Sequence, residues 1–178
     1  MISSAPYRFR FATIPRPLPV HRDSLARGGS VSGGQVKRGP NLASAAAGAR
    51  VIAVSSVFGD SAAWAAERAI DGDLSTAWSS AGDGDQAFVT VELGDATALT
   101  AVGLWTRTMT TSAQIRRFQV VTDGGDVLGP FDVPDATALH VFPVDARART
   151  LRFEVVESSG GNTGVIELAA YGAAAATD

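Results

Sequence analysis

AIDGDLSTAWSS, from Ala69 to Ser80, is the stretch of this 178-residue chain that says most about its fold. Asp71 and Asp73 flank a glycine, two hydroxyl residues follow, and Trp78 comes near the end. Aspartate bonds to its own backbone and glycine tolerates a positive φ, so the sequence predicts a tight turn. The same oxygens are the hard ligands that calcium prefers. The stretch therefore predicts a turn that either binds a cation or caps its own amides, with Trp78 as its anchor in the core.

Short apolar runs recur after this turn, and turn residues separate them. In QAFVTVEL, for example, Val89, Val91 and Leu93 alternate with polar residues, which places them on one face of a strand. The strand-like runs are 86–93, 101–107, 115–122, 138–144, 150–156 and 165–171. Only residues 62–70, AAWAAERAI, have a helical pattern. Many short strands with frequent turns predict an all-β fold, an antiparallel β-sandwich.

The charge and proline content change at residue 40. Residues 1–40 hold seven basic residues and one acidic residue, 7 − 1 = +6, and the rest holds 8 − 17 = −9, which together give the net charge of −3. Five of the eight prolines also lie in residues 1–40. Proline removes backbone donors, so no autonomous fold is expected there. We therefore predict a basic Pro/Gly-rich arm at 1–40, extended or disordered unless bound to a partner, and a domain at 41–178.

One piece of the arm has a pattern of its own. Tyr7-Arg8-Phe9-Arg10-Phe11 alternates aromatic and basic residues, as a strand with one apolar face does. Two interpretations stay open: a disordered leader, or an arm that adds a strand to a protein partner in an assembly. No nucleic-acid binding is expected, because the basic residues are spread thinly among prolines.

Several classes of protein are excluded by what the sequence lacks. There is no cysteine, so disulfides and thiolate metal sites are ruled out. No apolar run approaches the roughly 18 residues of a membrane span. The N-terminal residues contain no continuous apolar core of a secretory signal peptide. The sequence does not fix the localisation; an extracellular or virion-associated protein is favoured, without a visible signal peptide.

The sequence gives little sign of catalysis. The two histidines are His21 and His140, and neither has a recognisable nucleophile motif nearby. No phosphate-binding or dinucleotide-binding fingerprint is present. The carboxylates lie mainly in turns, which does not favour a paired-acid hydrolase site. We therefore expect no catalytic residues and predict that the chain is not an enzyme.

The order of the motifs resembles the discoidin family, also called coagulation-factor type C domains, together with galactose-binding-like, family 32-type carbohydrate-binding modules. The resemblance covers Asn41 to about Gly172. The motifs that carry it are Asn41-Leu42-Ala43, Val54-Ser55-Ser56, AIDGDLSTAWSS, FVTVELG from Phe88 to Gly94, GVIEL from Gly164 to Leu168, and Tyr171-Gly172. The family implies a jelly-roll β-sandwich of about eight antiparallel strands, whose first and last strands pair. That pairing is expected to bring the Asp-Gly-Asp turn beside Glu167.

Many carbohydrate-binding members of the family hold one structural calcium ion at this turn. The resemblance implies side-chain ligands at Asp71, Asp73, Thr76 and Glu167, with backbone carbonyls around Arg68 and Thr76 completing the shell. Calcium takes six to eight oxygen ligands, and a tight turn supplies several at once. The alternative stays open, because several members keep the turn without a metal, and there the carboxylates cap backbone amides.

Ligands of this family bind at loops on one end of the sandwich. The candidate ligand-binding residues here are Phe58, Trp64, Arg107 and Asn162. An aromatic ring stacks on the C–H face of a sugar, and Arg107 aligns with an arginine that many relatives use for ligand hydroxyls. The asparagine-glycine pair and the histidine that often accompany this arginine are absent, which argues against the usual galactose-type recognition. The alternatives are a packed ring for Trp64, a solvated charge for Arg107 and a turn former for Asn162.

These observations favour a non-catalytic binding module whose partner is a glycan or cell-surface polysaccharide. The alternative is a structural or decoration subunit of a larger assembly, for example a phage virion, tethered to a protein partner through residues 1–40.

Overall fold

The computed structural model describes residues 39–110 and 112–173. The predictions for the N-terminal arm, including the run Tyr7–Phe11, fall on residues outside these ranges. With η for a 3₁₀ helix, the elements in chain order are η1 (Ala45–Ala47), β1 (Arg50–Val54), η2 (Phe58–Asp60), η3 (Ala62–Trp64), η4 (Ala66–Ala69), β2 (Trp78–Ser79), η5 (Gly84–Gln86), β3 (Phe88–Thr106), β4 (Ile115–Thr122), β5 (Val127–Asp132), β6 (His140–Ser158) and β7 (Gly164–Gly172).

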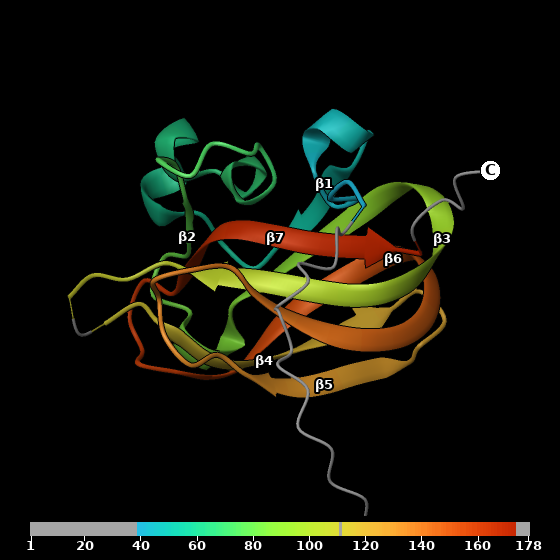
Figure 1. Ribbon diagram of the computed structural model, residues 1–178. Helices are drawn as coiled ribbons and strands as arrows, with labels where there is room; N and C mark the ends of the chain where they lie inside the picture. Colours follow the sequence, from blue (N-terminus) through green and yellow to red (C-terminus); the bar gives the residue numbers. More distant parts are fainter. Residues whose placement is uncertain (1–38, 111, 174–178) are drawn as a thin grey trace, which may run out of the picture. The chain divides into compact units, whose positions relative to one another are not determined.

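The strands form an antiparallel β-sandwich in which β3 and β6 take part in both layers (Figure 1). Residues 88–92 of β3 pair with β1 and with residues 150–154 of β6, and β4 and β5 extend this layer. Residues 97–106 of β3 pair with β7 and with the first half of β6, and β2 completes the second layer. The prediction of an all-β antiparallel sandwich is confirmed.

Two pairs of strands predicted as separate are continuous. The runs 86–93 and 101–107 are both part of β3, and the runs 138–144 and 150–156 are both part of β6. The chain bends between each pair of runs instead of ending the strand, and the pairing of β3 with β6 shifts register between Glu92 and Thr97. The polar residues between the two runs lie at a bend of the strand. A bend and a turn have the same polar pattern, so the sequence did not distinguish them.

Other differences concern short elements. Asn41-Leu42-Ala43 is not the opening strand that the resemblance implied, because it lies in a turn and the first strand begins at Arg50. The helix expected at 62–70 is two 3₁₀ turns, η3 and η4, since Ala65 between them has an extended backbone with φ −59° and ψ 152°. β5 was not predicted, because Gly129 and Pro130 interrupt its apolar pattern.

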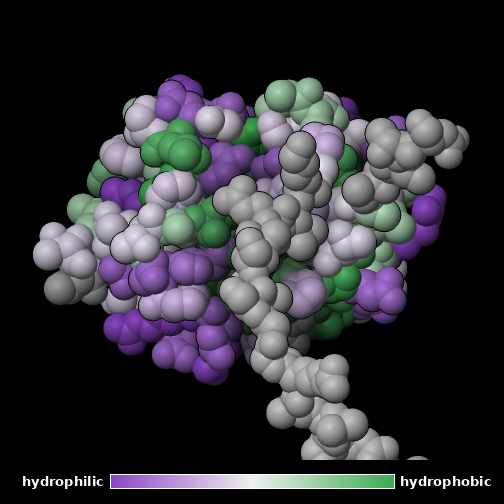
Figure 2. Space-filling view, viewed as in Figure 1, coloured by the Kyte–Doolittle hydropathy of each residue, from purple (hydrophilic) through white to green (hydrophobic). Residues whose placement is uncertain are grey.

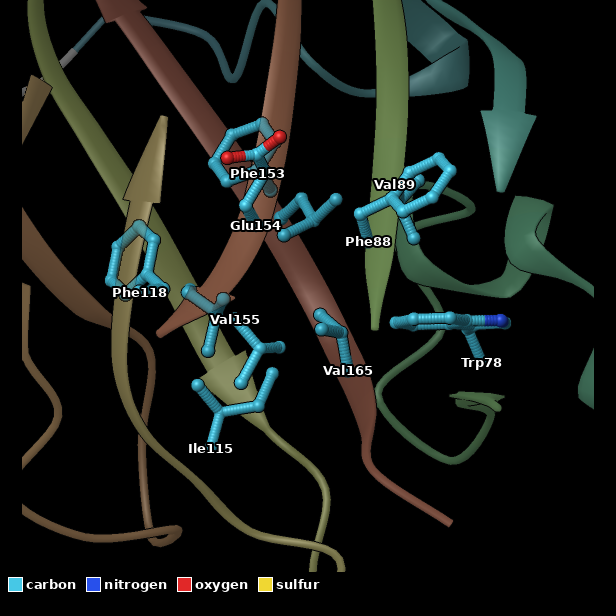
Figure 3. A pocket seen from close by; sticks show the side chains of 11 residues that line it. Trp78, Phe88, Val89, Ile115, Phe118, Phe153, Glu154, Val155 and Val165 are labelled. Carbon is cyan, nitrogen blue, oxygen red and sulfur yellow. The ribbon is translucent and has the colours of Figure 1, made fainter. Parts of the chain in front are cut away.

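The core lies between the two layers. The ring of Phe118 contacts those of Phe131, Phe142 and Phe153, with centroids 5.3–6.3 Å apart, while the 1% exposed Trp78 fills the end near the Asp-Gly-Asp turn. Apolar side chains and that of Glu154 line a small space of about 10 Å³ in the core, and Figure 3 shows how these side chains lie around it. That volume is close to the lower limit for one water molecule, so this space is too small for an organic ligand.

The part of the surface visible in Figure 2 outside the grey atoms is a mixture of hydrophilic and hydrophobic residues, with small green areas. Within residues 39–110 and 112–173, the exposed large apolar residues are Ile52, Phe58, Leu74, Met109, Val127 and Val156. Among the described residues, no helix is long and apolar enough to cross a lipid bilayer.

Candidate functional site

The Asp-Gly-Asp turn is held by hydrogen bonds among its own residues. Asp71 Oδ1 accepts a hydrogen bond from the Asp73 amide at 2.9 Å. The Thr76 hydroxyl lies 3.0–3.1 Å from both carboxylate oxygens of Asp71, and Arg68 Nη1 lies 3.3 Å from Asp71 Oδ2. Gly72 has a φ of +77°, a conformation that glycine adopts without strain. Local hydrogen bonds therefore hold most of the turn, while the backbone of Gly72 also interacts with the Glu167 carboxylate of β7.

Asp73 is engaged inside the turn. Its Oδ1 accepts hydrogen bonds from the Ser75 hydroxyl at 2.6 Å and from the Ser75 amide at 2.9 Å. The Ser75 hydroxyl and amide together lower the pKa of Asp73. Both aspartates thus accept a backbone amide of the turn, which is the amide-capping role that was left open for it.

Glu167 on β7 is the residue that the fold brings to the turn. Its side chain is buried, with 6% of the residue exposed, and its Oε2 has no hydrogen-bond partner among the described residues. Its Oε1 accepts a hydrogen bond from Asn41 Nδ2 at 3.1 Å. Burial first, and then the negative charge of Asp71, raise the pKa of Glu167 to about 7. A buried carboxylate beside a second carboxylate is an arrangement that a cation would stabilise.

Asn41 is the residue that sequence reasoning missed in this region. Its Nδ2 also donates to the Leu168 carbonyl at 2.8 Å, and its Oδ1 accepts from the Ala170 amide at 3.0 Å. The side chain thus fixes the start of the described domain to β7 and orients Glu167. The signal was present in the motif Asn41-Leu42-Ala43, which was interpreted as a strand instead of a turn.

The donor set fits a hard cation in part. Asp71 and Glu167 supply two carboxylates, and the hydroxyl of Thr76 and nearby carbonyls are oxygen donors of the type calcium uses. Within residues 39–110 and 112–173 no group of three or more histidine, aspartate or glutamate side chains is placed to share a metal. A calcium ion here would therefore depend heavily on neutral oxygens of the backbone.

A second cluster lies where β3 ends, and Arg107 is its centre. Arg107 Nη1 donates to Ser79 Oγ at 3.2 Å and to the Asn162 carbonyl at 3.1 Å. The guanidinium carbon of Arg107 lies 4.7 Å from the centre of the Trp64 ring. Partial burial lowers the pKa of Arg107, which remains charged at neutral pH because an arginine keeps its proton. Arg107 thus joins four segments that are distant in the sequence.

Hydrogen bonds tie the loops around this cluster together. Ser56 Oγ donates to Asp83 Oδ2 at 2.6 Å and accepts from the Ala81 amide at 2.8 Å. Trp78 Nε1 donates to the Ser56 carbonyl at 3.0 Å, so the tryptophan of the turn motif also holds the loop of residues 55–64, which carries Phe58 and Trp64. Ser158 Oγ donates to Asp85 Oδ1 at 2.6 Å. These bonds fix the loops in position before any ligand arrives.

Three of the four predicted ligand-binding residues come together. Trp64 stacks with Arg107, and Asn162 contacts Arg107 through its backbone carbonyl. Phe58, the fourth residue, lies in η2, in the loop of residues 55–64 that also carries Trp64, and it is 44% exposed. Ser79, which directly follows Trp78, was missed, because serine in a motif gives no sign of which partner it meets.

The fold is similar to solved structures that are 18–23% identical in sequence. A family 32 carbohydrate-binding module of NanJ from Clostridium perfringens, in complex with galactose, superposes with a TM-score of 0.59 at 18% identity, covering 69% of this chain and 93% of that one. The lectin domain of lectinolysin, complexed with Lewis B antigen, gives a TM-score of 0.59 at 20% identity and coverages of 77% and 99%. A chitosan-binding module from Paenibacillus sp. IK-5 gives 0.55 at 22%, with coverages of 75% and 100%. At this level of identity the likeness shows a shared fold.

The sequence itself supplies the family assignment. No curated protein matches the chain. The sequence model of the F5/8 type C domain matches residues 51–168, which include the turn motif, all of β3 to β6 and Glu167. On this match, and with the β-sandwich that accompanies it, the chain belongs to the F5/8 type C domain family, the discoidin family that its motifs resemble.

Proposed function

We propose that this chain is a non-catalytic carbohydrate-binding module whose ligand binds at the loop end around Arg107. The observation that carries the proposal is the joining of Trp64, Ser79 and Asn162 by one partly buried guanidinium. A fixed donor beside an aromatic ring suits a sugar, which offers hydroxyl groups and an apolar ring face. The fold likeness to carbohydrate-binding modules and lectin domains supports the same class of ligand.

Trp64 and Phe58 have different roles in the proposal, because Trp64 is the ring that contacts Arg107. Arg107 covers part of the Trp64 ring, so Trp64 orients the guanidinium. Phe58 is the more exposed ring and is the candidate platform for the sugar face. Asn162 contributes its carbonyl to Arg107, and its side-chain amide is the candidate contact for a ligand hydroxyl.

A glycan array with the full-length chain tests the proposal, followed by titration calorimetry on the hits. Phe58→Ala is expected to weaken binding at least tenfold without changing the melting temperature, because an exposed ring contributes little to the core. Val127→Ala, which removes an exposed apolar side chain from β5, is the matched control and should bind as the unchanged protein does. An array without any hit would overturn the proposed function.

We also propose that a calcium ion stabilises the Asp-Gly-Asp turn, with Asp71 and Glu167 as its charged ligands and Thr76 as a neutral one. The partnerless buried Oε2 of Glu167 supports this. Calcium would supply the positive charge that these two carboxylates lack, while Asn41 orients Glu167 and Asp73 keeps the turn closed through Ser75.

The alternative of a virion or assembly subunit is not supported by the similar structures, which are carbohydrate-binding modules and lectin domains.

A further inference from the structure

Arg107 differs from the other arginines of the described residues in its partners. Ion pairs with carboxylates are formed by Arg50, Arg68, Arg117, Arg149 and Arg152. Arg116 and Arg147 have no such pair within residues 39–110 and 112–173, but both are exposed to water. Arg107 is partly buried and has no carboxylate partner there either. A partly desolvated cation without a counter-ion is costly to keep.

The hydrogen bonds of Arg107 leave one edge of its guanidinium free. The group has five N–H donors in a fixed plane, and both bonds to the protein, to Ser79 and Asn162, come from Nη1. Nε and Nη2 have no hydrogen-bond partner among the described residues, and neither is a fully buried atom. Their N–H groups point to the same side, the geometry that holds the two oxygens of an acidic group.

Arg152 shows how the protein completes a similar arrangement elsewhere. Its guanidinium carbon lies 3.5 Å from the centre of the Phe88 ring, and its Nε donates to Glu154 Oε1 at 2.6 Å. Arg107 has the ring, Trp64, but not the carboxylate. The acidic residues of the adjacent loops, such as Asp83, bond to serine hydroxyls and lie outside ion-pair distance of Arg107.

We propose that the Nε–Nη2 edge of Arg107 binds an acidic group of a sugar, a carboxylate or a sulfate ester, so that the module selects acidic over neutral glycans. This inference rests on the proposed function. Two parallel charge-assisted hydrogen bonds are stronger than bonds to hydroxyls and fix the ligand's orientation. Trp64 and the two hydrogen bonds of Nη1 hold the guanidinium in one orientation before the ligand binds. Less conformational entropy is therefore lost when the acidic group binds to it.

The net charge of the domain limits how this selection operates. The region from residue 41 onward carries −9, so distant charges do not attract an acidic glycan. Their repulsion is screened beyond roughly 8–10 Å at physiological salt. Selection must therefore come from direct contact with Arg107, and it should persist at moderate ionic strength.

The test uses matched oligosaccharides and the full-length chain with calcium present. Titration calorimetry would compare a galacturonate oligomer with its fully methyl-esterified form, which keeps the sugar skeleton but removes the charge. A sulfated galactose oligomer and its desulfated counterpart distinguish sulfate from carboxylate as the source of the charge. We expect at least one acidic ligand to bind at least tenfold more tightly than its neutral form. Arg107→Gln should remove that preference, and Arg116→Gln, on an exposed unpaired arginine, should keep it.

The outcomes separate this inference from the proposed function. Equal binding of acidic and neutral forms, or a preference that survives in Arg107→Gln, overturns the selection of acidic glycans and leaves a carbohydrate-binding module standing. Failure of every glycan on the array overturns both. Should Arg107→Gln not fold, Arg107→Lys is the second variant, because lysine keeps the charge but lacks the two parallel N–H groups. The preference for the acidic form is then expected to fall several-fold, and an unchanged preference would overturn the inference.

Discussion

Glu167 and Arg107 carry opposite charges at neighbouring positions of the fold, and neither has an ion-pair partner among the described residues. Glu167 pairs in register with Trp105, two residues before Arg107. The carboxylate is buried and responds by a rise of its pKa to about 7, so it is neutral over much of the acidic range. The guanidinium cannot lose its proton near neutral pH, and it therefore keeps partial access to water and is held by a ring and a carbonyl.

The difference teaches how one domain can hold two uncompensated charges. A group that titrates can be buried deeply, because it becomes neutral when no counter-ion is present. A group that cannot titrate has to stay near the surface, where an external partner can reach it. On this basis the buried site suits a resident cation, and the accessible site suits a ligand that comes and goes.

The largest effect expected is that of calcium on Glu167. Calcium that binds only the folded state should raise stability by about 2.7 kcal/mol at a hundredfold excess over Kd. Thermal melts with calcium and with a chelator would measure it. Asp71→Ala and Glu167→Gln should both remove the response, and Asp73→Ala should reduce it less, because the Asp73 carboxylate bonds to Ser75. Identical melts with and without calcium would mean that the turn is only a capped loop.

The next effect concerns the ring that holds Arg107. Trp64→Ala should cost about 1–2 kcal/mol of stability, less than the 3–5 kcal/mol of a fully buried ring, since Trp64 is partly exposed and its stacking on Arg107 is lost. Glycan binding should weaken as well, because the guanidinium is no longer oriented. Denaturant unfolding and calorimetry would measure the two effects. A variant with lower stability and unchanged affinity would show that Trp64 is only a packing residue.

A smaller effect per unit of pH is expected in the metal-free protein. The folded-state pKa of Glu167, about 7, lies above its ordinary value of 4.5, so the folded protein holds a proton that the unfolded chain has released. This contribution to stability is complete below pH 4.5 and is lost as the pH rises through 7. The slope is at most about 1.4 kcal/mol per pH unit.

Glu167→Gln is the test of this assignment, because glutamine keeps the shape but does not titrate. Melts in a chelator between pH 4.5 and pH 7 should show a flatter dependence for this variant than for the unchanged chain. An equally steep dependence in Glu167→Gln would assign the titration to another group.

The smallest effect is expected from removal of residues 1–38. Asn41, which bonds to Glu167, and Trp64 and Asn162, which contact Arg107, lie after this segment. The melting temperature should therefore change by no more than a few degrees. A large fall would show that the basic arm supplies a countercharge or part of the core, and the comparison between the two sites would have to be revised.

The sequence by itself determined the fold class and the local chemistry of the turn. Alternation at Val89, Val91 and Leu93 predicted a strand with one buried face, and these three residues are buried. The hydrogen bonds of Asp71 and Asp73 join residues within five positions of each other, so sequence-local rules were sufficient to predict a tight turn. Strand ends were less well determined, because a bend within β3 and a turn between two strands have the same polar pattern.

Only the tertiary structure decided which charges remain without a partner. Glu167 and Asp71 are 96 positions apart, and Arg107 and Asn162 are 55 apart. Whether these side chains meet depends on the pairing of β3 with β7 and on the loops that β2 and β7 carry. The partnerless oxygen of Glu167 and the free edge of Arg107 cannot be recognised in the sequence, because burial and the absence of a countercharge are properties of the packed chain.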